Sequence, residues 1–167
     1  MSGAPPSKSR RRIATILREI PRAREQLLVA MEGFGPDFMQ DDFVAAALAD
    51  DARERNSVAV VERQYEVLLN WLHELGARGL AEAQRLGVVD KGPGHTWERL
   101  AALGVISHMS AERLQEGKEM RDALAHAYPP ANWKTLHEGV VVLVDELDGY
   151  LAGFERWAYE EEILPAP

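Results

Sequence analysis

Residues 132–160 decide the fold: NWKTLHEGVVVLVDELDGYLAGFERWAYE. Their large apolar side chains recur at alternating steps of four and three residues, at Leu136, Val140, Leu143, Leu147, Tyr150, Phe154 and Trp157. A heptad pattern of this kind forms one apolar seam along a helix, and the seam packs against another helix or a symmetry mate. Asn132 is a suitable N-cap. The stretch therefore predicts a long C-terminal helix in a helical bundle.

Apolar spacing of the same kind continues towards the N-terminus. A first segment carries Ile13, Leu17, Ile20, Leu27 and Met31, and a longer one carries Val61, Tyr65, Leu68, Leu72 and Leu75. Both patterns are typical of amphipathic helices. Pro21 interrupts the first of them, so we expect a kink or a break near Ile20.

Helix starts are predicted from residues whose side chains can accept a hydrogen bond from the first turn. Asp41 or Asp42 is expected to cap a helix that begins near Phe43, and Ser110 to cap one that runs to about Tyr128. Alternation of period two is absent over any useful length, so no sheet is expected. The fold prediction is an all-α bundle of five or six helices.

The chain divides into three parts by composition. Residues 1–12 form a basic N-terminal tail that is expected to be disordered, residues 13–160 a single helical domain, and residues 161–167 a frayed tail. The basic start has no long apolar core after it and no run of about 18 apolar residues follows. A cytoplasmic protein without membrane contact is the simplest interpretation.

Composition excludes several kinds of chemistry. The 167 residues include no cysteine, which rules out a disulfide framework, a thiolate nucleophile and cysteine-bound metal. His73, His95, His108 and His137 lack the spacing of metal ligands, and no Gly-rich phosphate loop is present, so neither a metal nor a cofactor is expected. A net charge of −8 argues against a broad nucleic-acid coat, but it leaves room for a small basic site.

The candidate site is the stretch RDALAHAY, residues 121–128. Arg121 lies on one helical stripe with Leu114, Gly117 and Tyr128, whereas Asp122 and His126 are four apart and share another face. The carboxylate of Asp122 is placed to orient the His126 imidazole. Arginine can clamp a phosphate through parallel hydrogen bonds and histidine can move a proton.

An arginine and a histidine together are a minimal set for cutting RNA without a metal. The 2′-hydroxyl must lose a proton, the leaving 5′-oxygen must gain one, and the phosphoryl oxygens need a cation. One Arg–His pair supplies few groups for these three tasks. Two pairs facing each other across a dimer would make a fuller site, and an exposed heptad seam is one way to build that dimer.

The pattern Arg-x4-His-x-Tyr, on a helix followed by a loop and a long final helix, resembles the HEPN superfamily and, more narrowly, its HepT-type toxins. The segment WERLAALGVI, residues 97–106, is similar to the element that precedes the catalytic helix in that family. The resemblance covers residues 61–157, and the first sixty residues match only in being helical.

The resemblance implies a HEPN-type bundle, a homodimer and a metal-independent endoribonuclease that leaves a 2′,3′-cyclic phosphate. Arg121 would be the phosphate-binding residue and His126 the proton-transfer residue, with Asp122 in the supporting position where the family most often has asparagine. It also implies a toxin–antitoxin pair. The partner, a minimal nucleotidyltransferase (MNT) antitoxin, would silence the toxin by transferring AMP to Tyr128.

Two other interpretations stay open. The chain could be a non-catalytic subunit that binds and presents substrate to a nucleotidyltransferase, an alternative that the negative charge and Asp122 favour. It could also be a structural dimerisation module, in which Arg121 forms an ion pair, His126 caps a helix end and Tyr128 anchors that end in the core.

Overall fold

The C-terminal helix α6 (Ala131–Glu160) packs its apolar seam inside the bundle. The computed structural model describes residues 7–124 and 131–165 of the chain. Within them, the seven seam residues named above are all at most 6% exposed. The predicted partner helix is therefore supplied by the same chain. The expectation that this seam is exposed for dimerisation is wrong, because the chain's own helices already cover it.

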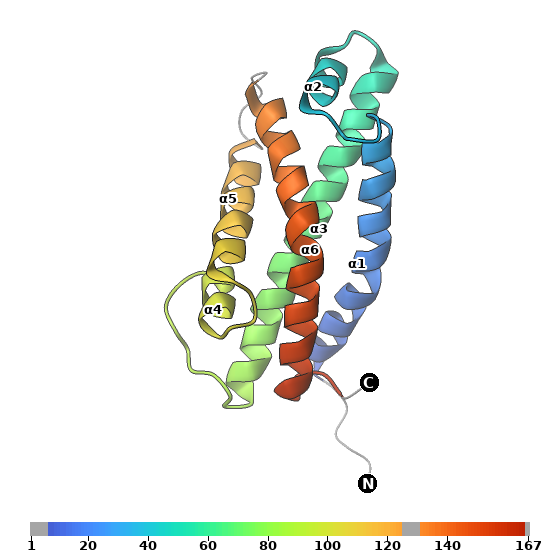
Figure 1. The fold of residues 1–167 in the computed structure, drawn as a ribbon. Coiled ribbons are helices and arrows are strands. Elements are labelled where there is room, and N and C mark those ends of the chain that lie inside the picture. The colour runs from blue at the N-terminus through green and yellow to red at the C-terminus, as the bar shows by residue number, and fades with distance from the viewer. Residues whose placement is uncertain (1–6, 125–130, 166–167) are drawn as a thin grey trace.

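Six helices form the described part of the chain, and no strand occurs in it. In order they are α1 (Lys8–Glu32), α2 (Gln40–Leu48), α3 (Ala52–Arg85), α4 (Thr96–Ala102), α5 (His108–Leu124) and α6. The predicted all-α bundle with a long C-terminal helix is confirmed. Figure 1 shows α1, α3, α5 and α6 running alternately up and down, while α2 lies across one end.

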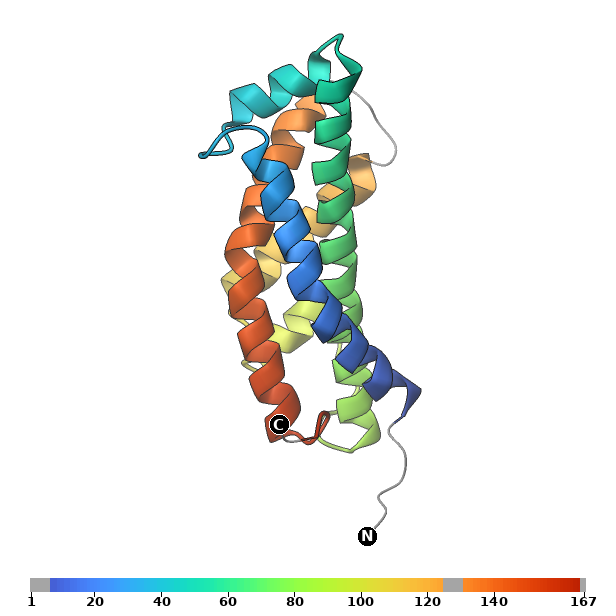
Figure 2. The ribbon, with the colours of Figure 1, turned by 90° about the vertical axis from the view of Figure 1, so that its right-hand side faces the viewer.

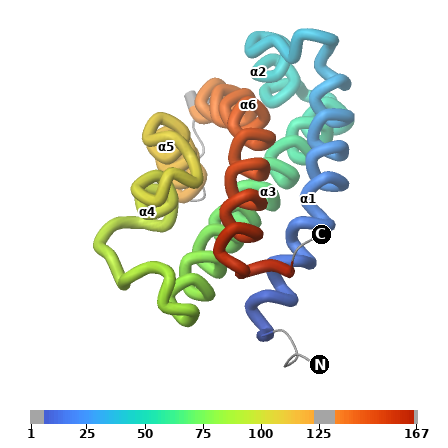
Figure 3. Tube along the Cα trace, turned by 60° about the horizontal axis from the view of Figure 1, so that its bottom comes forward, coloured from blue at the N-terminus to red at the C-terminus, as the bar shows by residue number. Residues whose placement is uncertain are grey.

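The helices are arranged around α3, the longest of them. Figure 2 shows α1 lying along one side of α3, with which it makes its main contact. Figure 3 shows α4 and α5 as a pair on the opposite side of the molecule from α1. That pair packs against both α3 and α6. The end of α5, which carries Arg121, is thereby held beside α3.

Helix α3 continues through Gly76 and Gly79, and its seam is buried. At Gly76 the missing side chain is a packing requirement. A Cβ atom there would lie 2.8 Å from side-chain atoms of Leu100 on α4 and Tyr150 on α6. Glycine at this position lets three helices approach closely where α4 joins the bundle.

Pro21 does not break α1, which is continuous from Lys8 to Glu32. Of the kink or break expected near Ile20, the break does not occur. Ile13, Ile20 and Leu27 are fully buried on the packed face of α1, whereas Pro21 is exposed. Burial of that face, which spans both sides of the proline, outweighs the loss of one backbone hydrogen bond.

The N-terminus of α2 lies earlier than predicted. The helix begins at Gln40, and Met39 occupies the N-cap position without a side-chain hydrogen bond. Asp41 and Asp42 are therefore inside the first turn, not caps. Their carboxylates still favour this end of the helix, because they lie near its positive dipole.

The caps of the last two helices are also displaced from the predicted residues. Ser107 caps α5, since its Oγ accepts a hydrogen bond from the Ser110 backbone N–H at 3.0 Å. Helix α6 begins at Ala131, so Asn132 lies within the helix. The errors of one to three residues arise because neighbouring polar side chains are equally able to cap and tertiary contacts choose between them.

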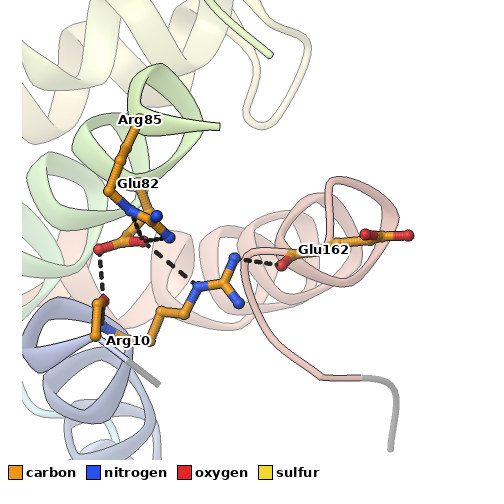
Figure 4. Close-up of polar contacts among 5 residues, drawn as sticks. Arg10, Glu82, Arg85 and Glu162 are labelled. Carbon is orange, nitrogen blue, oxygen red and sulfur yellow. Dashed lines mark hydrogen bonds and ion pairs between the residues drawn. The ribbon is translucent and has the colours of Figure 1, made fainter. Parts of the chain in front are cut away.

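The N-terminal turn of α1 is fastened to the far end of α3 (Figure 4). Buried Glu82 forms ion pairs with Arg10, at 3.4 Å, and with Arg85, at 2.9 Å. Ser7 Oγ donates a hydrogen bond to the same carboxylate at 2.7 Å. Arg10 also donates to the backbone oxygen of Glu162 at 2.8 Å. These bonds join both ends of the chain to α3.

Both predicted tails are therefore shorter than expected. Residues 8–12 belong to α1, so they are not part of a disordered tail. Within the predicted frayed segment 161–167, Ile163 and Leu164 are buried against the core. Apolar burial and the contacts of Glu82 order these residues. Neither effect can be predicted from the local composition of the chain.

Candidate functional site

Arg121 lies on the last described turn of α5 and points towards α3. Its Nη2 donates a hydrogen bond to the side-chain oxygen of Asn70 on α3. Its Nη1 lies 3.1 Å from Oδ1 of Asp122, and the side chain is 26% exposed. Leu114, on the same stripe of α5, is buried. The side chain is thus mostly buried, and it is paired with Asn70 and Asp122.

Asp122 is engaged by two cations. Besides Arg121, Lys118 Nζ lies 3.5 Å from its other carboxylate oxygen, at a spacing of one helical turn. The Asp122 side chain is half exposed. Because this one carboxylate is shared by two cations, it neutralises neither of them fully. Asp122 therefore contacts the predicted phosphate-binding residue directly, and this ion pair is the one that the structural interpretation of Arg121 expects.

The other two predicted site residues, His126 and Tyr128, lie outside the described residues. The predicted end of α5 near Tyr128 and the expected contact of Asp122 with His126 lie outside them as well. The described half of the candidate site consists of Arg121 and Asp122 on α5, with Asn70 opposite on α3.

The guanidinium of Arg121 retains capacity to bind an anion. Each of its two Nη atoms carries two hydrogens and has one partner among the described residues, Asn70 or Asp122, whereas Nε is shielded by protein. Asn70, which holds the other side of the group, is a neutral acceptor and removes no charge. An arginine held in this way can bind a phosphate oxygen with little further ordering of its side chain.

Three residues near Arg121 were not predicted: Asn70, His73 and Lys118. Burial lowers the pKa of His73 below its ordinary value of 6.5, and the charges of Lys118, His95 and Arg121 lower it further, whereas Asp122 acts in the opposite direction. His73 therefore lies within electrostatic range of Arg121. Sequence spacing alone could not reveal this, because it depends on how α3 and α5 align.

The arginine run at the start of the chain is largely used inside the molecule. Arg10 pairs with Glu82, and Arg12 pairs with Glu74 at 2.9 Å. Arg11 alone faces a groove between α1 and α6. The run is therefore part of the bundle and not a free basic arm.

Neither a cluster of metal ligands nor a membrane-spanning helix occurs in the described ranges. No group of three or more histidine and acidic side chains there could hold a metal ion. None of the described helices has both the length and the apolar composition that crossing a bilayer requires. Comparison with known proteins adds no relative: neither a protein-family model, nor a curated protein, nor a solved structure matches this chain.

Proposed function

We propose that this chain is a metal-independent endoribonuclease of the HEPN type, the toxin of a toxin–antitoxin pair that acts in the cytoplasm. The observation that carries the proposal is Arg121. It is 26% exposed, held by the neutral Asn70 and only partly neutralised by Asp122. The motif residue His126 follows it by five positions.

In the proposed reaction Arg121 binds the non-bridging oxygens of one phosphodiester. The 2′-oxygen attacks phosphorus as its proton leaves, and the P–O5′ bond breaks. His126 transfers a proton in this exchange, and the leaving 5′-oxygen is released as a hydroxyl. The products are a 2′,3′-cyclic phosphate and a 5′-hydroxyl, and no metal or cofactor takes part.

A homodimer with two Arg–His pairs is part of the proposal. Because the α6 seam is buried within one chain, the two copies would have to meet elsewhere, with the motif ends of α5 near each other. A minimal nucleotidyltransferase would act as antitoxin. It would transfer AMP from ATP to the Tyr128 hydroxyl and release pyrophosphate, and the added nucleotide would block RNA entry by bulk and charge.

The test of the reaction is cleavage of single-stranded RNA in EDTA by wild type and by His126→Ala. Loss of the proton-transfer group should lower the rate by about 10²–10⁴-fold. His108→Ala is the matched control, since His108 is exposed at the start of α5. The products should carry 2′,3′-cyclic phosphates, and a 2′-deoxy substitution at the cleaved position should abolish cutting there. Intact RNA after incubation with folded wild-type protein would overturn the proposal.

A second candidate function is a non-catalytic subunit that binds and presents substrate to a nucleotidyltransferase. The ion pair between Asp122 and Arg121 favours it, because a neighbouring carboxylate opposes phosphate binding. Complex formation with a nucleotidyltransferase, without RNA cleavage and without AMP on Tyr128 by intact-mass spectrometry, would support this function over the first.

A further inference from the structure

His73 lies one helical turn from Asn70, the residue of α3 that accepts a hydrogen bond from Arg121 of α5. The two helices run in opposite directions (Figure 1). Asn70 on α3 bonds to Arg121 on α5. His73 follows Asn70 by three residues and Lys118 precedes Arg121 by three, so each is one helical turn further along the same contact. The positive charges of Lys118 and Arg121 both act on the His73 imidazole.

The His73 ring is fixed by packing but keeps its nitrogens free. Its ring meets Trp97 edge-on, with centroids 5.4 Å apart and an angle of 81° between the planes. Trp97 itself is fully buried, so this contact is anchored in the core. Neither ring nitrogen of His73 is hydrogen-bonded to another described residue. A half-buried imidazole with unused nitrogens can exchange a proton with a ligand.

A groove leads to His73 from the side of α4. It has a volume of about 360 Å³, and its polar lining includes His73, Gln84, His95 and Arg99. Arg99 donates to the backbone oxygen of Asp90, a neutral acceptor, at 3.3 Å. Its positive charge is therefore available to a phosphate in the groove. A single strand of RNA lying here would contact Arg99 and His73.

The electrostatic surroundings favour the neutral imidazole. Burial lowers the pKa of His73 first, followed by the charges of Lys118, His95 and Arg121, and Asp122 opposes them. Because the pKa lies below 6.5, His73 is mostly unprotonated at pH 7. A neutral imidazole is the form that accepts a proton.

We propose that His73 is a second catalytic residue, the general base that takes the proton of the 2′-hydroxyl while Arg121 holds the phosphate. This inference rests on the proposed function. The O2′–H bond breaks as O2′ bonds to phosphorus, and the proton moves to a ring nitrogen of His73. The P–O5′ bond breaks, and the leaving oxygen takes its proton from His126, the proton-transfer residue of the proposed function.

The test compares His73→Gln with His108→Gln over pH 5 to 9, in single-turnover cleavage of RNA with EDTA. Loss of the base should lower the rate by about 10²-fold or more and remove the limb on which the rate rises with pH. His108→Gln should retain both rate and profile. A His73→Gln protein that is folded and cleaves with the wild-type rate and profile overturns the inference and leaves the proposed function intact.

A second variant keeps the test valid if His73→Gln does not fold. Lys118→Met removes a positive charge that disfavours imidazolium, so the pKa of His73 should rise. The rising limb of the pH profile should move to higher pH. An unmoved limb overturns the role of His73. A wild-type protein that leaves RNA intact overturns the proposed function and this inference together.

Discussion

At the scale of single residues, Asp122 governs how strongly Arg121 can bind an anion. The carboxylate lies 3.1 Å from Arg121 and 3.5 Å from Lys118, so it competes with any phosphate for both cations. The sequence places an acidic residue next to the motif arginine. The structure adds that its charge is directed at that arginine.

Asp122→Asn should strengthen RNA binding. Removing the charge frees both cations while an amide can still accept a hydrogen bond, so the dissociation constant for a 2′-deoxy oligonucleotide should fall by roughly two- to fivefold. Asp50→Asn, at an exposed position on the same chain, should leave the constant unchanged. Fluorescence anisotropy measures both. Unchanged or weaker binding by Asp122→Asn would contradict this view of the carboxylate.

Glu74 forms ion pairs that hold the fold together, and its charge changes with pH. Both of its oxygens accept from Arg12, at 3.0 and 2.9 Å, and Arg78 donates to one of them at 2.7 Å. The hydrogen bonds from Arg12 lead the causes that lower the pKa of Glu74 to about 2, and burial opposes them. Because the folded value lies below the ordinary 4.5, the charged carboxylate stabilises the folded state.

The Glu74 contribution should disappear at acid pH. It is complete above pH 4.5 and is lost as the pH falls towards about 2, where the carboxyl is protonated in the folded protein too. The difference in unfolding free energy between wild type and Glu74→Gln should therefore shrink over that interval in urea titrations. Glu19→Gln, at an exposed position, is the matched control for replacing a carboxylate. A difference that is constant with pH would contradict the ion-pair account.

At the scale of elements, close helix contacts depend on small residues in α6. A Cβ at Gly153 would collide with the backbone oxygen of Val105, in the loop between α4 and α5. Gly149, one turn earlier on the same helix, has nothing within 4 Å of a Cβ atom. Both glycines lie on α6, but only Gly153 is needed for the α4–α5 pair to pack against this helix.

Gly153→Ala should destabilise the fold by about 1–3 kcal/mol, because a backbone atom cannot move aside easily. Gly149→Ala should stabilise it by about 0.5–1 kcal/mol, because alanine loses less conformational freedom in a helix. Urea unfolding monitored by circular dichroism gives both values. Equal effects at the two positions would show that the α6 contact with Val105 is not as described.

Helix existence was predictable from the sequence, but helix boundaries and contacts were not. The apolar seams of α3 and α6 could be predicted from residue spacing, because burial of one helix face makes apolar residues recur with the helical period. Ser107 caps α5 in place of the predicted Ser110, because either serine can accept a hydrogen bond from a backbone N–H of a first turn. Continuity of α1 through Pro21 depends on the α3 surface that it covers, which no local pattern encodes.

At the scale of the whole molecule, one chain buries its own heptad seam. A long apolar seam is equally compatible with a dimer, and only the tertiary arrangement decides. The same reason limits prediction of the site. Arg121 and Asp122 follow from a motif, but Asn70 and His73 become neighbours only through the alignment of α3 with α5.

Leu147→Ala tests whether the seam acts within one chain. Leu147 is fully buried, so truncation should cost about 2–5 kcal/mol, whereas Val141→Ala, at a position that is 36% exposed, should cost about 0.5 kcal/mol or less. The loss at Leu147 should be the same at low and high protein concentration. A loss that depends on concentration would assign the seam to a dimer interface.

The central claim is that Arg121 is the phosphate-binding cation of a metal-independent ribonuclease site. The most direct measurement is the initial rate of single-stranded RNA cleavage in EDTA by wild type, Arg121→Ala and Arg63→Ala. Arg63 is an exposed arginine of α3 and controls for loss of charge. We predict a fall of about 10²–10³-fold for Arg121→Ala and no change for Arg63→Ala. Equal cleavage by Arg121→Ala and wild type, or no cleavage by wild type, would contradict the claim.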